Sequence, residues 1–210
     1  MFIPRKFRQE KIEELLAVIQ KYSFATLVSY SDNGMEATHI PVLLESVGET
    51  LILKAHIAKA NPLWKKVQNG SDVLVIFNGP NCYISPNHYP TKAEHGRAVP
   101  TWNYVVVHVK GSISFVTDPD WVYSVIDGLT TKHEAGSSNS WSISDAPKEY
   151  IQKMLPAIVG VEIEVNSLEG QWKLSQNQPE LNQQGVINGL SSLNEPASQA
   201  VASMVRAQVE

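Results

Sequence analysis

The chain has 210 residues, of which 43% are hydrophobic, and a formal net charge of −4. This length predicts one large domain or one domain with an appendage, and the apolar content is sufficient for a sizeable core. The negative charge argues against a protein that holds nucleic acid through many phosphates. The single cysteine, Cys82, excludes an internal disulfide and a multi-cysteine metal site, and it is typical of a buried residue in a reducing compartment.

Membrane contact is not expected, because no apolar run is long enough to cross a bilayer. The basic residues near the start are not followed by the apolar segment of a secretory signal, so we expect a cytoplasmic protein. These residues form one cluster, Arg5, Lys6, Arg8 and Lys11. We interpret the cluster as a solvated arm, with contact to a phosphate backbone as the alternative.

The first half of the chain predicts one helix followed by strands. Ile12, Leu15, Leu16 and Ile19 recur at i, i+3, i+4 and i+7, which predicts a helix over residues 8–21 that covers a sheet. A Ser-Asp-Asn-Gly turn at residues 31–34 joins two alternating segments into a hairpin. Strands are predicted at residues 24–30, 36–44, 51–56 and 71–78, with 82–85 continuing the sheet and a short helix at 61–68.

The second half begins with a polar loop at residues 86–100, which is long enough to be functional or mobile. A long alternating strand follows, and Asp118 with Pro119 predicts the start of a helix. The remaining predicted elements are a strand at 101–116, a second helix from about 144 to 155, a strand at 158–165, and a final amphipathic helix around 197–205. Many strands joined by hairpin signals, with helices at the margins, predict a mainly β (α+β) fold, a closed or nearly closed antiparallel barrel.

Residues 51–64 predict an anion site. An apolar strand leads into a helix N-terminus, at which Asn61 is a suitable N-cap and Pro62 suits the first helical position. His56 and Lys59 lie close by in the sequence. Backbone N–H groups at a helix N-terminus, with cations beside them, favour a bound phosphate.

Aromatic and amide residues beside the strands are typical of the lining around a planar ligand. A flat heteroaromatic ring needs apolar contact on its faces and donors and acceptors at its edge. Each residue taken singly also fits a core aromatic or a loop cap, but together with the phosphate site near Lys59 the set favours flavin mononucleotide (FMN). The residues concerned are Trp102, Asn103, Lys173, Ser175 and Gln176.

Other chemistry has weaker support. The six histidines include His88 and His95 in the polar loop, but no pair has a recognised ligand spacing, and we predict no metal. Haem needs one axial histidine, so residue spacing neither supports nor excludes it. No dinucleotide fingerprint, Walker-type lysine loop or nucleophile elbow is present, which argues against a dinucleotide fold, an NTPase and an elbow-type hydrolase.

Several segments together resemble the PaiB family of FMN-binding negative transcriptional regulators, over nearly the whole chain. The resemblance implies an antiparallel split β-barrel with peripheral helices, related to pyridoxamine-phosphate oxidases and flavin reductases, in a homodimer with two flavin sites at the interface. It implies a barrel domain at residues 1–180, with a polar linker and a C-terminal helix packed on the barrel at 181–210. The segments are Met1-Phe-Ile-Pro-Arg-Lys-Phe7, Ala37-Thr-His-Ile-Pro-Val-Leu-Leu44, His56-Ile-Ala-Lys-Ala-Asn-Pro-Leu-Trp64, Tyr83-Ile-Ser-Pro86, Tyr89-Pro-Thr-Lys92, Val99-Pro-Thr-Trp-Asn-Tyr104, Val107-His-Val-Lys-Gly111 and Lys173-Leu-Ser-Gln-Asn177.

The resemblance also implies roles for residues in these segments. One departure concerns Asn87 and His88, which stand where the family is expected to have an aromatic residue before the tyrosine of Tyr-Pro-Thr-Lys. By motif, Thr38, His39, Ile40 and Pro41 are expected along the isoalloxazine, His56 and Lys59 at the phosphate, Trp102 and Asn103 on a neighbouring strand, and Lys173, Ser175 and Gln176 closing the site.

The expected function is negative regulation of transcription, and it rests on the resemblance alone. If the protein binds DNA, the basic arm from Arg5 to Lys11, doubled in a dimer, is the expected contact, because the sequence contains no convincing helix-turn-helix. The alternatives are a flavin-dependent oxidoreductase of the pyridoxamine-phosphate oxidase or flavin reductase type, and a haem-binding or haem-degrading split barrel. No catalytic residue is assigned.

Overall fold

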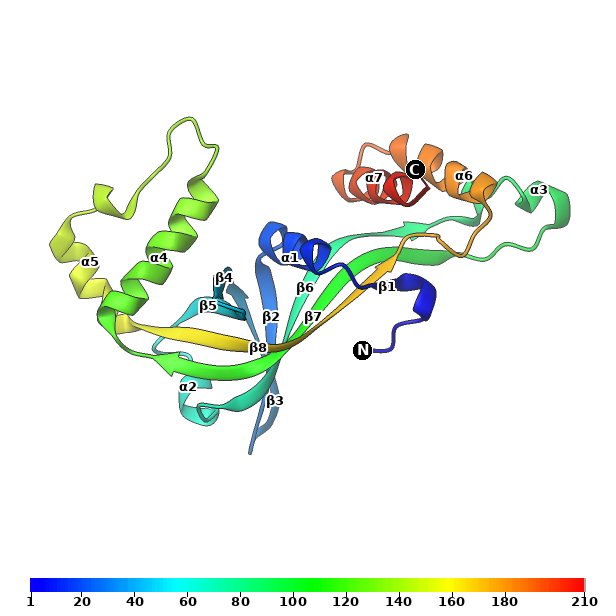
Figure 1. The fold of residues 1–210 in the computed structure, drawn as a ribbon. Helices are drawn as coiled ribbons and strands as arrows, with labels where there is room; N and C mark the ends of the chain where they lie inside the picture. Colours follow the sequence, from blue (N-terminus) through cyan, green and yellow to red (C-terminus); the bar gives the residue numbers. More distant parts are fainter. Residues whose placement is uncertain (210) are drawn as a thin grey trace. The chain divides into compact units, whose positions relative to one another are not determined.

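The computed structural model describes residues 1–209 and contains an eight-stranded sheet with helices (Figure 1). The strand order is β3-β2-β6-β7-β8-β5-β4, and β1 pairs with β8. This path begins at β3 and ends at β4, so the sheet is open within the described chain. The strands are β1 (Arg8–Gln9), β2 (Phe24–Ser31), β3 (Gly34–Pro41), β4 (Leu43–Val47), β5 (Thr50–Ala58), β6 (Ser71–Ile84), β7 (Thr101–Val116) and β8 (Ile158–Lys173).

Seven α-helices are described, together with four short 3-10 turns. Within residues 1–209, none of the helices is both long enough and apolar enough to cross a bilayer. The helices are α1 (Ile12–Lys21), α2 (Leu63–Lys66), α3 (Lys92–His95), α4 (Pro119–Glu134), α5 (Lys148–Met154), α6 (Glu180–Ser191) and α7 (Pro196–Val209). The turns are η1 (Arg5–Phe7), η2 (Pro86–His88), η3 (Ile143–Asp145) and η4 (Leu155–Ala157).

Most of the predicted elements are present, but several boundaries differ. The first helix begins at Ile12 and not at residue 8, because Arg8 and Gln9 pair with β8 and form β1. The strand predicted at 36–44 is divided into β3 and β4 between Pro41 and Leu43. The polar loop at 86–100 contains η2 and α3. The sequence pattern located these elements correctly and missed the pairing that sets their ends.

The described chain forms two compact units, and β6, β7 and β8 contribute residues to both. Unit 1 consists of residues 1–18, 78–107 and the chain from 169 onward. Unit 2 consists of Ile19–Phe77 and His108–Leu168. Each unit is described by itself below.

In unit 2, α4 lies against strands at positions without side chains. A Cβ atom at Gly160 on β8 would lie 2.2 Å from the Trp121 ring, and a Cβ atom at Gly128 would lie 2.8 Å from Leu43. The Asp118 carboxylate accepts the Trp121 backbone N–H at 2.8 Å, which caps α4 as predicted. These contacts fix both the start and the middle of α4 against the sheet.

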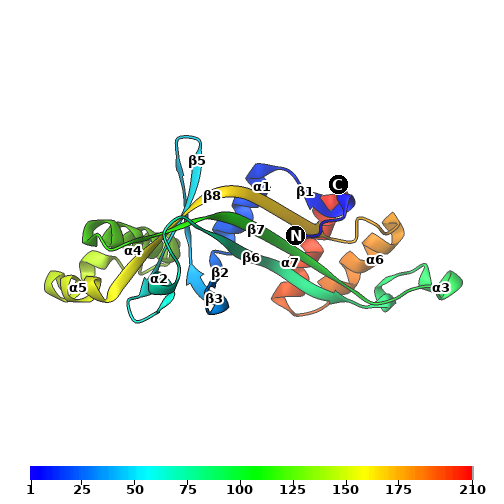
Figure 2. The ribbon, with the colours of Figure 1, turned by 90° about the horizontal axis from the view of Figure 1, so that it is seen from below.

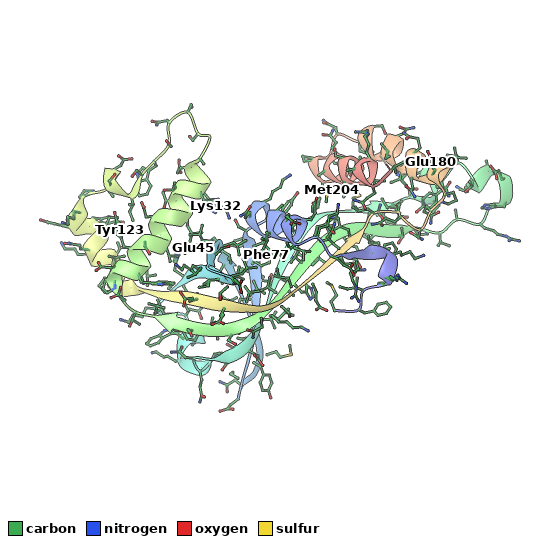
Figure 3. All side chains as sticks on the ribbon, viewed as in Figure 1. Glu45, Phe77, Tyr123, Lys132, Glu180 and Met204 are labelled. Carbon is green, nitrogen blue, oxygen red and sulfur yellow. The ribbon has the colours of Figure 1, made fainter. Side chains whose placement is uncertain are left out.

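Polar contacts extend the same packing. The Lys132 ammonium on α4 donates to the Val42 carbonyl at 3.4 Å, and burial lowers the pKa of Lys132. On the neighbouring strands, Lys54 pairs with Glu45 at 2.6 Å. Figure 3 labels Lys132 and Glu45, together with Phe77 of β6, which is completely buried. The unit is therefore an apolar sheet core with its charged groups paired or held at the margin.

In unit 1, α6 and α7 lie side by side (Figures 1 and 2). Val186 and Leu190 of α6 and Val201 and Val205 of α7 are at most 1% exposed. Figure 3 labels Glu180 at the start of α6 and Met204 on α7. The segment after residue 180 was predicted to be a polar linker, and it forms α6 instead. Its buried apolar residues, Val186, Ile187 and Leu190, share one helical face, and the polar side chains around them obscured that pattern.

The polar residues of α6 also hold the Tyr-Pro-Thr-Lys segment. The buried Asn182 side chain accepts from both the hydroxyl of Thr91 at 3.0 Å and its backbone N–H at 3.3 Å. Gly185 and Gly189 lie against His88, so that a Cβ atom at Gly185 would be 2.1 Å from the His88 carbonyl oxygen. Glycine at these positions allows α6 to approach η2 closely.

We predict that Gly185→Ala destabilises the protein by about 1–3 kcal/mol, because the new methyl group meets a backbone atom that cannot rotate away. In an open helix the same change would stabilise by nearly 1 kcal/mol. Urea unfolding followed by circular dichroism measures the difference. Asn188→Ala, at an exposed position of the same helix, is the control. A Gly185→Ala variant at least as stable as the parent would contradict the close packing.

Candidate functional site

In unit 1, three of the motif segments come together around one cavity of about 170 Å³. Tyr89 follows η2, Thr101 and Asn103 lie on β7, and Lys173 and Ser175 lie at and just beyond the end of β8. The prediction that Asn103 belongs with Lys173 and Ser175 therefore matches their placement. The cavity is lined by Tyr89, Val99, Pro100, Thr101, Asn103, Lys173, Ser175, Asn177 and Gln178.

Asn103 has an unused acceptor in this cavity wall. The side chain is 1% exposed, and its Nδ2 donates to Ser175 Oγ at 2.9 Å. Its Oδ1 is also buried and has no hydrogen-bond donor among the described residues. A buried acceptor without a partner costs free energy that a ligand N–H can recover.

Lys173 places a cation next to Asn103. Its ammonium donates to the Trp102 carbonyl at 2.8 Å and to the Thr101 hydroxyl. It forms no ion pair with a carboxylate in residues 1–209. Burial lowers the pKa of Lys173. Two neutral acceptors hold the ammonium in place and leave its charge uncompensated.

The turn after β8 has its own internal support. Ser175 has a φ of +65°, in the left-handed region that non-glycine residues seldom adopt. The Gln176 side chain spans this turn, because its Oε1 accepts from the Leu174 N–H at 2.7 Å and its Nε2 donates to the Trp172 carbonyl at 2.6 Å. Gln176 was predicted to contact the ligand. In the structure its amide groups already have backbone partners.

Trp102 does not line the Asn103 cavity. Neighbouring residues of a strand point to opposite faces, and Trp102 lines a separate hollow of about 480 Å³ with Asn81 and Tyr104. It is 53% exposed and meets the Tyr83 ring edge to face, with 6.3 Å between ring centroids. The predicted pair of Trp102 and Asn103 thus serves two different surfaces of unit 1.

In unit 2, His56 and Lys59 lie at the end of β5, just before α2. The Nδ1 atom of His56 is buried and has no hydrogen-bond partner among residues 1–209. Burial lowers the pKa of His56. The exposed Lys59 donates its backbone N–H to the Ala157 carbonyl at 2.8 Å, and its own carbonyl accepts from Trp64 Nε1 at 3.0 Å. The backbone of Lys59 is fixed, and its side chain is exposed.

The helix predicted at 61–68 is shorter than expected. α2 consists of four residues, Leu63–Lys66, and Pro62 has helical dihedral angles just before it. Asn61 Oδ1 accepts from the Leu63 N–H at 3.0 Å, which is the capping bond expected from the sequence. A single turn has a small dipole, so an anion here would depend mainly on the nearby side chains.

The residues predicted along the flavin ring lie on β3 and alternate between its two faces. His39 is exposed and its Nδ1 is 3.1 Å from the Thr26 hydroxyl, while the Phe24 ring centroid is 6.2 Å from its own. Ile40 is 2% exposed and belongs to the core. Thr38 shares the face of Ile40, and Pro41 shares that of His39. The placement of these residues against a ligand remains a prediction.

Sequence reasoning did not assign six of the nine residues that line the 170 Å³ cavity. Five of them belong to motifs that had been noted, and Gln178 directly follows one; the five are Tyr89, Val99, Pro100, Thr101 and Asn177. Tyr89 is 5% exposed, and burial raises its pKa. Membership in these short motifs is the signal that could have found all of them except Gln178.

The histidines of the polar loop have structural partners. His88 packs against the glycines of α6, and His95 Nδ1 accepts the Arg97 backbone N–H at 3.0 Å. In the described part of the chain, no three His, Cys, Asp or Glu side chains are grouped to hold a metal ion. Cys82 is buried, and burial together with Glu195 raises the pKa of its thiol to about 11.

Comparison with known proteins gives a family and several relatives. Residues 1–167 match the family described as "Putative FMN-binding domain". The chain is 30% identical over 205 residues to the protease synthase and sporulation protein PAI 2 of Bacillus subtilis, covering 98% of this chain and 96% of the relative. These matches confirm the resemblance to the PaiB family and the prediction of FMN as the cofactor of the domain.

Solved structures support the fold. The FAD and heme binding protein of Mycobacterium smegmatis aligns with a TM-score of 0.54 at 14% identity, over 79% of this chain and 73% of that one. The flavocytochrome Anf3 of Azotobacter vinelandii aligns with a TM-score of 0.56 at 12% identity, over 81% of this chain and 72% of that one. The predicted split-barrel fold class is confirmed, but the closed or nearly closed barrel expected from the strand pattern is wrong, because the sheet is open within the described residues.

The half-buried His56 gives a pH-dependent prediction. In the unfolded chain His56 takes up a proton near pH 6.5, whereas burial lowers its pKa in the folded protein. Its contribution to stability is therefore present above pH 6.5 and is lost as the pH falls through the folded pKa. We predict that the unfolding free energy of the parent falls between pH 7.5 and pH 5 by more than that of His56→Gln.

Urea unfolding at both pH values measures this difference in ligand-free protein. His133→Gln, which replaces an exposed histidine of α4, is the control and is expected to behave like the parent. Equal pH dependence of the parent and His56→Gln would show that burial of His56 does not control its protonation.

Proposed function

Because the chain belongs to the FMN-binding domain family, we propose that it is a cytoplasmic, homodimeric, PaiB-like negative regulator of transcription that holds FMN. The observation that carries FMN binding on the structural side is the buried Asn103 Oδ1, which lacks a donor at the wall of a cavity lined by three motif segments. Bound FMN supplies a redox-active ring with a polar edge. The residues described above fit the chemistry of that edge.

In unit 1, Asn103 and Lys173 would hold the polar edge of the ring. The Asn103 Oδ1 would accept an N–H of the ligand, and the Lys173 ammonium would donate to a ligand carbonyl or stabilise negative charge on the ring. Ser175 keeps the Asn103 amide oriented through its hydroxyl. This assignment uses side chains whose other hydrogen bonds are already made, so little reorganisation is needed on binding.

In unit 2, His56 and Lys59 are the residues that we assign to a phosphate, as the family resemblance implies. Lys59 supplies an exposed cation on a backbone that two hydrogen bonds hold in place. His56 supplies a buried nitrogen without a partner. A phosphate near His56 favours its charged form and so raises its pKa, opposite to the effect of burial in the free protein.

The regulatory role and the dimer have separate support. The regulatory role is supported by the 30% identity to the sporulation protein PAI 2 along almost the whole of both chains. The dimer is supported by exposed apolar residues on one face of the β2–β3 hairpin. Phe24, Tyr30 and Met35 are 70%, 72% and 74% exposed. Phe24 and Tyr30 are an even number of residues apart on β2, and Met35 pairs with Tyr30, so all three side chains lie on the same face.

We predict that Lys59→Ala weakens FMN binding about tenfold and leaves riboflavin binding unchanged, because only FMN carries the phosphate. Lys173→Met is predicted to weaken both ligands by a similar factor, because it acts on the ring that they share. Quenching of flavin fluorescence measures both affinities.

Lys65→Ala is the control for charge, because Lys65 is an exposed cation on α2 that stacks on Trp64 at 5.3 Å. An equal loss of FMN and riboflavin affinity in Lys59→Ala would remove the phosphate assignment. An unchanged FMN affinity in both Lys59→Ala and Lys173→Met would remove the proposed site.

For a regulator, we predict that replacing Arg5, Lys6, Arg8 and Lys11 by alanine abolishes binding to a duplex selected by the parent protein from a random DNA pool. All four side chains are exposed, and together they form the basic cluster near the start of the chain. Fluorescence anisotropy measures DNA binding, and light scattering on the same samples reports the dimer. Unchanged DNA affinity in the dimeric variant would exclude the arm as the contact.

A further inference from the structure

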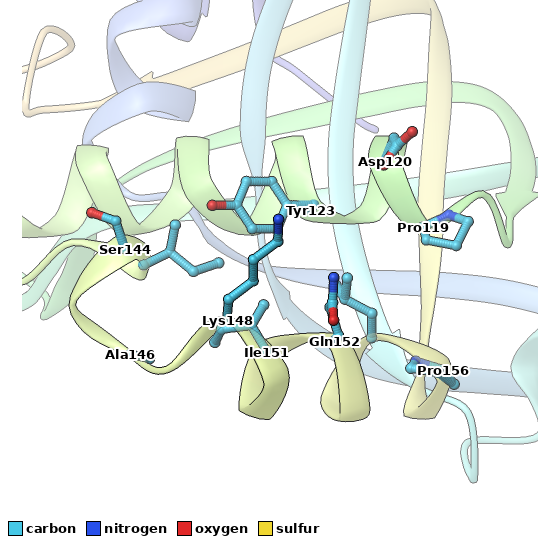
Figure 4. A pocket seen from close by; sticks show the side chains of 11 residues that line it. Pro119, Asp120, Tyr123, Ser144, Ala146, Lys148, Ile151, Gln152 and Pro156 are labelled. Carbon is cyan, nitrogen blue, oxygen red and sulfur yellow. The ribbon is translucent and has the colours of Figure 1, made fainter.

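A cavity of about 600 Å³ lies within unit 2 between α4 and α5 (Figure 4). None of the residues predicted to bind FMN lines it. Its walls all come from residues 119–156, which include the start of α4, η3, α5 and η4. The volume falls within the range of about 300–1,000 Å³ that is usual for small-molecule sites.

The body of the cavity is apolar. Ile143 is 4% exposed, Ile151 and Leu155 are half-buried, and Pro119 and Pro156 complete the wall. The Tyr123 ring covers one side (Figure 4). A flat apolar group of the size of one or two fused rings suits such a wall, because it gains contact on both faces.

The polar groups of the cavity are arranged asymmetrically. The Lys148 side chain extends from α5 toward the Tyr123 ring, and the Gln152 amide projects from α5 toward α4 (Figure 4). Asp120 lies at the opposite end, beside Pro119. Lys148 takes part in no ion pair within the described residues. One end of the cavity is therefore cationic and the other anionic.

We propose that this cavity binds a small aromatic monocarboxylate. The carboxylate pairs with the Lys148 ammonium and accepts an N–H of Gln152, while the ring lies between Tyr123 and the apolar wall. Asp120 at the other end repels a second negative group, so the site selects a monoanion over a diacid. The proposal does not depend on FMN, because the two sets of residues do not overlap.

The test is calorimetric titration of the purified protein, with excess FMN present, with naphthoate, neutral naphthamide and naphthalene dicarboxylate. We expect naphthoate to bind once per chain, and the other two compounds to bind at least about tenfold more weakly. Lys148→Gln is expected to weaken naphthoate about tenfold and to leave naphthamide unchanged. FMN affinity is expected to stay the same in this variant.

Lys153→Gln is the matched control, because it removes the same charge from α5 at an exposed position outside the cavity. Both replaced lysines are exposed, so both variants are expected to fold. The proposal is overturned if naphthoate does not bind, if Lys148→Gln and Lys153→Gln have equal effects, or if FMN competes with naphthoate. Equal binding of naphthamide would overturn the assigned role of Lys148.

Discussion

The lack of a side chain at Gly160 is the constraint on which the packing of unit 2 depends. Gly160 pairs with His56 in the β5–β8 ladder. Because residue 160 has no side chain, the Trp121 ring occupies the space above it and fixes the start of α4 on the sheet. The same helix carries Tyr123 and Asp120, so this contact also positions one wall of the α4–α5 cavity. Any larger residue at 160 would displace Trp121 and, with it, both the helix and the cavity.

Unit 1 depends on a different feature, the polar cluster of Asn103, Lys173 and Ser175. Within the described residues, the hydrogen bonds of this cluster are incomplete. Asn103 bonds to Ser175, and Lys173 bonds to Thr101 and to the Trp102 carbonyl, yet one buried acceptor and one positive charge have no partner of opposite character within the described residues. An apolar pair of similar shape would avoid the desolvation of these groups. The polar residues Asn103 and Lys173 are explained if a ligand supplies the hydrogen-bond donor that Asn103 Oδ1 lacks. The unpartnered Oδ1 is therefore the strongest structural support for a site at Asn103.

Local sequence patterns predicted most of the fold. The predictions were wrong where an element depends on contacts with residues distant in the sequence. The Asp118–Pro119 start of α4 and the alternating strands depend on neighbours in sequence, and they were located correctly. The start of α1 depends on the pairing of Arg8 and Gln9 with the distant strand β8. The helix α6 was missed because its buried Asn182 is satisfied by Thr91, a partner 91 residues away that composition does not reveal. In the site, the shared motifs grouped Asn103 with Lys173. They did not show that the Gln176 side chain is hydrogen-bonded to the backbone of its own turn.

Local charge, and not net charge, decides which anions this protein can hold. At −4 the chain as a whole repels anions, and its ion pairs within residues 1–209 use Lys54, Lys66 and the terminal amine. Lys59, Lys148 and Lys173 take part in none of these pairs. Lys148 and Lys173 line cavities, and Lys59 follows, three residues later, the His56 whose Nδ1 has no partner within the described residues. A nearby unpaired cation outweighs distant surface carboxylates, because solvent and salt screen the latter within about 10 Å. Unpaired lysines at separate positions therefore allow the proposed phosphate and carboxylate sites to be tested independently, by substituting one lysine at a time.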